Sequence, residues 1–212
     1  MKLYDTPLAP NPRRVRWFMA EKGIDDIEVM TLNLMKAEHK TPDYLAKAGL
    51  PNVPALELDD GTTITESVAI CRYLERRYPE PNLFGRTAEE EAVIEMWTRR
   101  GEFLVSMPLM NMVRHSHPAL AALERQIPEV AESSRQGGLR GLKVLDRRLA
   151  ETEWLAGDRI TIADIIAFSG VDFSRMVKFE CPEELPNAAR WVAAMRARPA
   201  AKAGMPERIP AA

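Results

Sequence analysis

The sequence is poor in features that several classes of protein require. Its 212 residues include two cysteines, Cys71 and Cys181, far apart and without a CxxC pair, so neither a disulfide framework nor a structural zinc site is supported. The formal net charge is -2, with acidic and basic residues mixed throughout, which gives no broad field for a nucleic acid or an anionic membrane. No signal segment follows Met1, and no apolar run approaches the roughly 20 residues of a membrane span. We therefore expect a cytoplasmic protein that holds any charged ligand locally.

The first third of the chain alternates strands and a helix. Residues 2–5 and 27–32 have the alternating pattern of strands. Between them, Asn11 and Pro12 have the pattern of an N-cap followed by proline at the first helical position, and Gly23 ends the predicted helix. The order strand, helix, strand is that of a right-handed parallel crossover, which predicts half of a small α/β domain.

A hairpin and a second helix follow. Residues 55–58 and 62–64 flank the turn Asp59-Asp60-Gly61, where aspartate and glycine tolerate a positive φ, and we expect residues 38–51 before it to be irregular and polar. Helical spacing of apolar residues then runs over residues 66–78, and prolines 79 and 81 forbid continuation. We therefore place a first domain at residues 1–79 and a linker rich in turn residues at 80–87.

The rest of the chain shows long helical periods and no convincing strand. Residues 88–212 are predicted to form an all-helical domain of about four to six helices. One helix start is well marked, because Thr161 precedes Asp164 by three residues and an apolar run follows, which is the pattern of a capping box. It predicts a buried helix from residue 162 to about residue 177. The fold class is thus α/β followed by all-α.

The Val53-Pro54 dipeptide stands immediately before the third predicted strand. An X-Pro bond is the only peptide bond for which the cis form costs little. A cis bond here would leave the N–H and C=O of Val53 facing outward, where they can pair with a peptide ligand as if it were one more strand. The alternative is an ordinary trans proline that begins the strand, which the dipeptide alone favours.

Two further places offer groups for the charged ends of a ligand. Glu66 and Ser67 begin the third predicted helix, where free N–H groups attract a carboxylate to Ser67 while Glu66 accepts from an ammonium group. A simple helix cap is the alternative. His39 and Lys40 lie in the polar stretch, where either could receive another carboxylate, although loop charges are usually only solvated.

Asn11 is the residue with the clearest possible catalytic role. It precedes a predicted helix whose free N–H groups face whatever lies beside it, and Arg13 and Arg14 add positive charge. Such surroundings lower the pKa of a thiol and favour the thiolate. Asn11 could equally cap the helix and do nothing more, with both arginines facing water.

Several segments taken together resemble the glutathione transferase superfamily over essentially the whole chain. They are, in order, KLYDTPLAPNPRRVRWFMAEKGI, EHK at residues 38–40, NVPAL, TESVAICRYLERRYP and GDRITIADI. The resemblance implies a thioredoxin-like amino-terminal domain with a glutathione site, an all-helical carboxy-terminal domain and a homodimer. Glutathione is then the co-substrate, and no metal is needed. An asparagine after a proline is most similar to bacterial Nu-class and related fungal-type members.

The resemblance also implies a role for each residue singled out above. By matching motif, the roles are Asn11 at the sulfur, Val53 and Pro54 at the cysteinyl backbone, Glu66 and Ser67 at the γ-glutamyl end, and His39 or Lys40 at the glycyl carboxylate. Two departures stand out. Ala9 occupies the place of a catalytic hydroxyl, so the amide of Asn11 and main-chain N–H groups are expected to assist the thiolate. Residues 48–51 replace the usual Asn-Pro-x-Gly turn.

The implied function is detoxification by transfer of the glutathione thiolate to an electrophilic apolar substrate. The electrophile is expected against the helix that carries Met107, Met110, Asn111 and Arg114, although the helical spacing of the methionines alone favours plain core or dimer packing. Because the site lacks a hydroxyl, glutathione-dependent disulfide-bond reduction is a second possibility. A non-catalytic binding protein that keeps the fold is a third, since fold does not fix function.

Overall fold

The computed structural model describes residues 1–7 and 9–205, and the chain divides into two compact units. The first comprises Met1–Pro81 with residues 202–205, and the second comprises Asn82–Ala201. Residues 206–212, which we predict to belong to the helical domain, lie outside the described residues, as does Leu8. Within the described ranges, no helix is long and apolar enough to cross a membrane.

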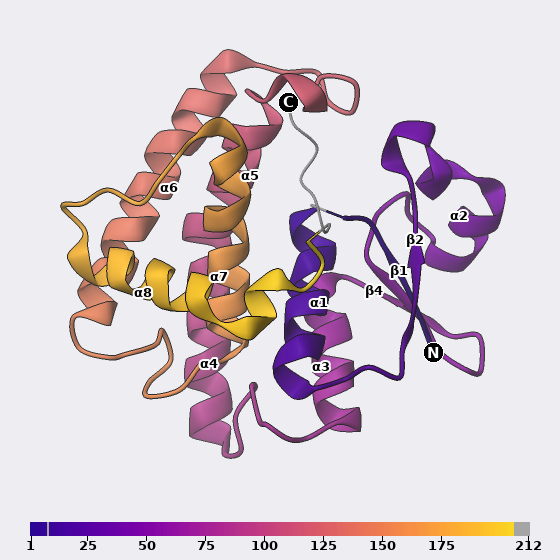
Figure 1. Ribbon diagram of the computed structural model, residues 1–212, viewed down its shortest axis with the longest axis horizontal. Coiled ribbons are helices and arrows are strands. Elements are labelled where there is room, and N and C mark those ends of the chain that lie inside the picture. Colours follow the sequence, from indigo (N-terminus) through magenta and orange to yellow (C-terminus); the bar gives the residue numbers. More distant parts are fainter. Residues whose placement is uncertain (8, 206–212) are drawn as a thin grey trace. The chain divides into compact units, whose positions relative to one another are not determined.

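The first unit is built on a four-stranded sheet with the strand order β2-β1-β3-β4 (Figure 1). Strands β1 (Lys2–Asp5) and β2 (Glu28–Thr31) run parallel and are joined by helix α1 (Pro10–Lys22), as predicted. Strands β3 (Ala55–Glu57) and β4 (Thr63–Thr65) form the predicted hairpin, and β3 runs antiparallel to β1. Helix α3 (Ser67–Arg77) follows β4 and packs beside α1.

Apolar side chains of α1, α3 and the sheet form the core of this unit. Leu3 of β1, Phe18 of α1 and Ile70 of α3 are fully buried, and each such side chain contributes about 1.5–3 kcal/mol through burial. One ion pair joins the two helices inside this core, because Lys22 Nζ lies 2.8 Å from a carboxylate oxygen of Glu75. The sheet and the two helices thus share one core.

Residues 38–51 differ from our expectation of an irregular stretch. They contain the 3-10 helix η2 (Glu38–Lys40) and helix α2 (Pro42–Ala48), which follow a first 3-10 helix, η1 (Leu34–Lys36). Thr41 caps α2 by accepting a hydrogen bond from the N–H of Tyr44, and Gly49 ends the helix at φ 72°. The expectation is wrong because this local cap, the proline at the first helical position and the terminal glycine outweigh the polar composition.

The second unit consists of helices joined by loops, with no β-strand among its described residues, which confirms the predicted class. Its elements are α4 (Ala88–Gly101), the π-helical segment η3 (Glu102–Ser106), α5 (Met107–Arg114), η4 (Pro118–Leu120), α6 (Pro128–Leu149), α7 (Ile162–Phe173), η5 (Ser174–Val177), α8 (Pro186–Ala197) and η6 (Pro199–Lys202). Helix α7 and the 3-10 turn η5 together cover the predicted range 162–177.

Glycines let α6 and α7 approach the π-helical segment closely. A Cβ added to Gly141 of α6 would lie 1.9 Å from the carbonyl oxygen of Leu104, and one added to Gly170 of α7 would lie 2.4 Å from Cα of Ser106. Both contacts are with backbone, which cannot move aside as a flexible side chain can. The irregular η3 segment is therefore held between two helices that have no room for a side chain at these points.

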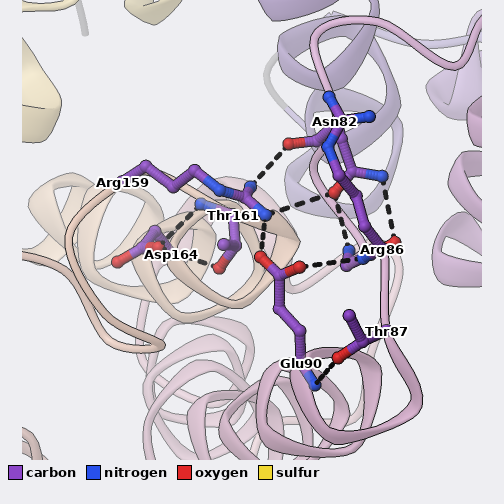
Figure 2. Close-up of polar contacts among 8 residues, drawn as sticks. Asn82, Arg86, Thr87, Glu90, Arg159, Thr161 and Asp164 are labelled. Atoms are coloured by element: carbon purple, nitrogen blue, oxygen red, sulfur yellow. Dashed lines mark hydrogen bonds and ion pairs between the residues drawn. The ribbon is translucent and has the colours of Figure 1, made fainter.

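The start of α7 is fixed by a buried carboxylate, Asp164. One oxygen accepts from the main-chain N–H and the hydroxyl of Thr161 at 3.0 and 3.1 Å (Figure 2). The other accepts from the N–H of Leu155 at 3.0 Å and from Nε1 of Trp191 at 2.9 Å. The predicted capping box is confirmed, and the same side chain ties α7 to the loop before it and to α8.

A second polar cluster fixes the segment that leads into α4. Arg159 donates to the main-chain and side-chain oxygens of Asn82 at 2.6 and 3.2 Å and pairs with Glu90 (Figure 2). Glu90 also accepts from the N–H of Arg86 at 2.8 Å, while Thr87 caps α4 by accepting from the N–H of Glu90 at 3.2 Å. These contacts anchor the chain from Asn82 onward to the loop that precedes α7.

Candidate functional site

The strand register brings the predicted site segments to one end of the sheet. Asp5 ends β1 opposite Thr31, which ends β2, while Ala55 begins β3 opposite Thr65, which ends β4. Tyr4 pairs with Ala55 as well, so all four of these strand ends lie at the same edge. The segments that leave or enter the strands there carry residues 9–11, 39–40, 53–54 and 66–67. The sheet therefore gathers side chains that are far apart in the sequence.

Helix α1 begins two residues earlier than its N-cap pattern predicts. Ala9, at φ -71° and ψ 132°, is the N-cap, and Pro10 is the first helical residue, so Asn11 lies in the first turn and not at the cap. The prediction of an asparagine cap is wrong because Pro10, with its φ fixed near -65°, already fits the first helical position. Asn11 keeps an exposed side chain at the start of the helix.

Two prolines make the amide of Asn11 the main donor at this helix end. Pro10 and Pro12 have no N–H, and the N–H of Arg13 donates to the carbonyl of Ala9 at 3.1 Å. Among the described residues, the N–H of Asn11 has no hydrogen-bond partner. Asn11 thus presents a main-chain donor and a side-chain amide together, at the positive end of the helix dipole. That arrangement stabilises an anion beside it.

Val53 presents the second set of free main-chain groups. The Val53-Pro54 bond is cis, as predicted. The side chain of Val53 packs against a cluster formed by Tyr44, Ala48 and Ala55. Its N–H and C=O have no intramolecular partner within the described part of the chain. An extended ligand could therefore satisfy both groups as a neighbouring strand would.

The start of α3 is held in an uncommon backbone conformation. Glu66 is the N-cap of α3 at φ 68° and ψ 118°, a region that residues other than glycine seldom adopt. Its side chain is exposed, whereas Ser67 is buried. Within the described residues no side chain caps this helix, so its first N–H groups remain available to an anion.

His39 and Lys40 differ sharply in their surroundings. Lys40 is exposed, and His39 is 8% exposed with a buried Nδ1 that has no hydrogen-bond partner within the described residues. Burial, and then the charge of Lys40, lower the pKa of His39 below its usual value, so the neutral imidazole prevails near pH 7. A buried ring nitrogen without a partner is costly and is suited to receive a polar ligand atom.

Arg14 is a site neighbour to which the sequence alone assigns no specific contact. Its Nη1 donates to Oγ of Ser67 at 3.4 Å, which links α1 to the first residue of α3. Arg13 and Arg14 are both buried, so the alternative in which they face water is wrong. The signal that could have found them is their spacing, since positions 14, 15 and 18 lie on the buried face of one helix.

Neither cysteine offers a reactive thiol. Cys71 lies buried in α3, where burial raises the pKa of its thiol. Cys181 is partly buried, and burial raises the pKa of its thiol to about 11. A thiol stays protonated and weakly nucleophilic under these conditions. Any thiolate chemistry at this site must therefore come from a bound ligand.

Family comparisons identify the whole architecture. The amino-terminal domain model of glutathione S-transferases matches residues 9–77, and the carboxy-terminal domain model matches residues 104–199. The chain is 38% identical to glutathione S-transferase 2 of Saccharomyces cerevisiae over 205 residues, which covers 95% of this chain and 88% of the yeast protein. The chain belongs to the glutathione transferase superfamily.

Solved structures of this superfamily agree with the fold. The crystal structure of Gtt2 from Saccharomyces cerevisiae has a TM-score of 0.88 at 38% identity, covering 95% of this chain and 99% of Gtt2. A structure of glutathione S-transferase-I bound with lactoylglutathione has a TM-score of 0.78 at 25% identity, covering 95% of this chain and 96% of that one. The predicted thioredoxin-like domain and helical domain of a glutathione transferase are thus confirmed.

Proposed function

We propose that this glutathione transferase binds glutathione at the sheet edge described above and stabilises its thiolate at the start of α1. The observation that carries the proposal is the free amide of Asn11 at a helix start where two prolines remove the competing donors. The sulfur of glutathione lies beside this end, and the helix dipole lowers the pKa of its thiol. Ala9, which has no hydroxyl, leaves this task to Asn11 and the main chain.

The rest of the tripeptide binds to main-chain and side-chain groups at the same edge of the sheet. The main-chain N–H and C=O of Val53 pair with the cysteinyl residue, and cis-Pro54 keeps these groups at the edge. Ser67 and the first N–H groups of α3 hold the γ-glutamyl carboxylate, and Glu66 accepts from its ammonium group. His39, through its unpaired Nδ1, or the exposed Lys40 receives the glycyl carboxylate. Bound lactoylglutathione in the related glutathione S-transferase-I supports this ligand class.

The reaction is attack of the thiolate on an electrophilic carbon of an apolar substrate. A carbon–sulfur bond forms, and the leaving group departs with its electron pair, so no metal and no protein nucleophile takes part. The second unit carries an exposed methionine, Met107, on α5, while Met110 one turn later is buried in the core of that unit. Methionine repacks readily around different shapes, which suits a broad substrate range.

Assays with two substrates test the reaction type. Conjugation to a chlorinated nitrobenzene tests attack on carbon, and reduction of hydroxyethyl disulfide tests attack on sulfur. We expect the first activity to depend on Asn11. Activity with the disulfide alone would assign the chain to glutathione-dependent disulfide reduction. Retention on immobilised glutathione without either activity would mark a non-catalytic binding protein.

We also propose that the protein is a cytoplasmic homodimer. Val93 and Met96 are exposed on α4, beside a groove of about 500 Å³ that Val144 and Arg147 of α6 help to line. Exposed apolar residues beside a groove are typical of a protein interface. Both cysteines are free thiols, which agrees with a reducing compartment. Light scattering of the wild type and of Met96→Glu tests the dimer, which the charged variant is expected to dissociate.

A further inference from the structure

A buried cation lies directly behind the start of α3. Arg14 is 4% exposed, and its Nη1 donates to Oγ of Ser67, itself 5% exposed, at 3.4 Å. The charge of Arg14 also acts on the thiol of Cys71, one turn further along α3, where it opposes the rise in pKa that burial causes. The guanidinium therefore lies beside the first turn of α3 and contacts Ser67.

This contact fixes the direction in which Ser67 can hydrogen-bond. A hydroxyl has one proton to donate and two lone pairs that accept, whereas a guanidinium only donates. Because Oγ of Ser67 accepts from Arg14, its single proton is left for another partner. That partner has to be a hydrogen-bond acceptor. The N–H groups in the uncapped first turn of α3 are donors as well. The Ser67 hydroxyl and these N–H groups therefore all need a hydrogen-bond acceptor.

The neighbouring arginine does not share this arrangement. The guanidinium of Arg13 lies 5.3 Å from the ring centroid of Trp17, one turn along α1, and Arg16 pairs with Asp5 at 3.8 Å. Arg14 instead donates to Ser67. Its effect is therefore specific to the place where the γ-glutamyl end is proposed to bind.

We propose that Arg14 is a positioning residue that keeps Ser67 a hydrogen-bond donor and thereby makes the start of α3 select the α-carboxylate of a γ-glutamyl group. The inference rests on the proposed glutathione site. It explains how that site distinguishes the α-carboxylate of the γ-glutamyl group from its ammonium group. The positive charge behind Ser67 polarises its O–H bond and strengthens the contact to an anion. Arg14 itself does not touch the ligand.

A pair of ligands isolates this effect. Glutathione and γ-aminobutyryl-cysteinyl-glycine differ in the α-carboxylate, so the ratio of their dissociation constants measures how strongly the protein selects that group. We expect Arg14→Met to reduce this ratio about tenfold, as loss of one charge-assisted hydrogen bond does. Ser67→Ala should reduce it similarly. The double variant should lose no more than either single one, because both act through the same hydroxyl.

Two further variants separate positioning from a structural role. Lys22→Met also removes a buried cation between α1 and α3, and it should lower the melting temperature but leave the ratio unchanged. Arg14→Lys keeps the charge and should retain part of the selectivity.

Three results would contradict the proposal. Equal loss of affinity for both ligands in Arg14→Met would make the residue structural, and unchanged affinity for both would show that it has no role in binding. An unchanged ratio in Ser67→Ala would overturn the proposal even where Arg14→Met does not fold. Failure of the wild type to bind glutathione at all would instead remove the proposed function, so the two failures are distinguishable.

Discussion

Two helix starts in this molecule use opposite solutions to the same problem. The first N–H groups of any α-helix lack partners within the helix. At the start of α7, the N–H of Ile162 donates to the carbonyl of Leu83 and that of Asp164 to the carbonyl of Thr161, while the buried carboxylate of Asp164 accepts from the N–H of the N-cap, Thr161. At the start of α3 no side chain cap is recorded within the described residues, and the N-cap, Glu66, has φ 68°. The first helix start is complete by itself, and we propose that a ligand completes the second.

We propose that the start of α7 serves the stability of its unit and that the start of α3 serves binding. A carboxylate three residues into α7 belongs to the chain, so its contribution is to the stability of the fold. The start of α3 has instead a serine whose proton is free, and a strained residue that costs about 1–3 kcal/mol. Strain without an internal benefit is the expected sign of a site that selection keeps for a ligand.

The largest effect on stability should come from a substitution at the start of α7. Asp164→Ala removes the partner of four donor groups, among them Nε1 of Trp191, which loses its acceptor in the core. We expect the free energy of unfolding in urea to fall by about 3–5 kcal/mol. Glu129→Ala, an exposed acid in the first turn of α6, should change it by less than about 0.5 kcal/mol. A loss of glutathione binding with unchanged stability would break the comparison.

The next largest effect on stability should come from the packing of α6 against η3 in the second unit. Gly141→Ala places a methyl group 1.9 Å from the backbone oxygen of Leu104, which should cost about 2–4 kcal/mol of unfolding free energy. The matched control is Gly137→Ala, one turn earlier in α6, whose new Cβ would meet Pro108 at an ordinary 3.6 Å. This control should gain about 0.5–1 kcal/mol from helix propensity. Equal effects of the two variants would contradict the close approach of α6 to η3.

Glu66→Gly tests whether the strain at α3 serves binding. Glycine adopts φ 68° at little cost, so the variant should gain about 1 kcal/mol of unfolding free energy. It should also lose about tenfold in glutathione affinity, because the acceptor for the ligand ammonium is gone. Lys178→Gly, at φ 57° in the second unit, should likewise gain stability without a change in affinity. A less stable Glu66→Gly with unchanged affinity would remove the distinction between the two helix starts.

The smallest effect concerns pH and separates His39 from Lys40. Burial lowers the pKa of His39 in the free protein, whereas a bound carboxylate raises it, so binding takes up a proton. The affinity for S-methylglutathione, which has no thiol, should therefore rise about three- to tenfold as the pH falls from about 8 to about 5.5. His39→Gln should abolish this dependence. A flat wild-type profile, with weaker binding by Lys40→Gln at every pH, would assign the carboxylate to Lys40.

The sequence predicts those parts of the structure that depend on neighbours in the chain. The capping box at Thr161 and the hairpin turn are local patterns, and the structure keeps both. The start of α1 is misplaced by the sequence because asparagine is a common cap, while Pro10 before it fits the first helical position equally well. Helix α2 has a cap, a proline and a terminal glycine, but its seven residues are too few to show an apolar period.

Contacts between distant segments are the part that the sequence could not predict. The π-helical segment around Leu104 packs against Gly141 of α6 and Gly170 of α7. These glycines lie 37 and 66 residues after Leu104 in the chain. The contact of Arg14 with Ser67 depends on the packing of α1 against α3. Motif matching identifies candidate binding residues. The direction of each hydrogen bond, however, can be assigned only from the packed helices.

The central claim is that the start of α1 activates the thiol of bound glutathione through Asn11. The most direct measurement is the absorbance of the thiolate as a function of pH for glutathione bound to the wild type and to Asn11→Ala. The account predicts that the wild type lowers the pKa of the bound thiol well below that of free glutathione, and that Asn11→Ala raises it by about one unit. Superimposable titration curves for the two proteins would contradict the account.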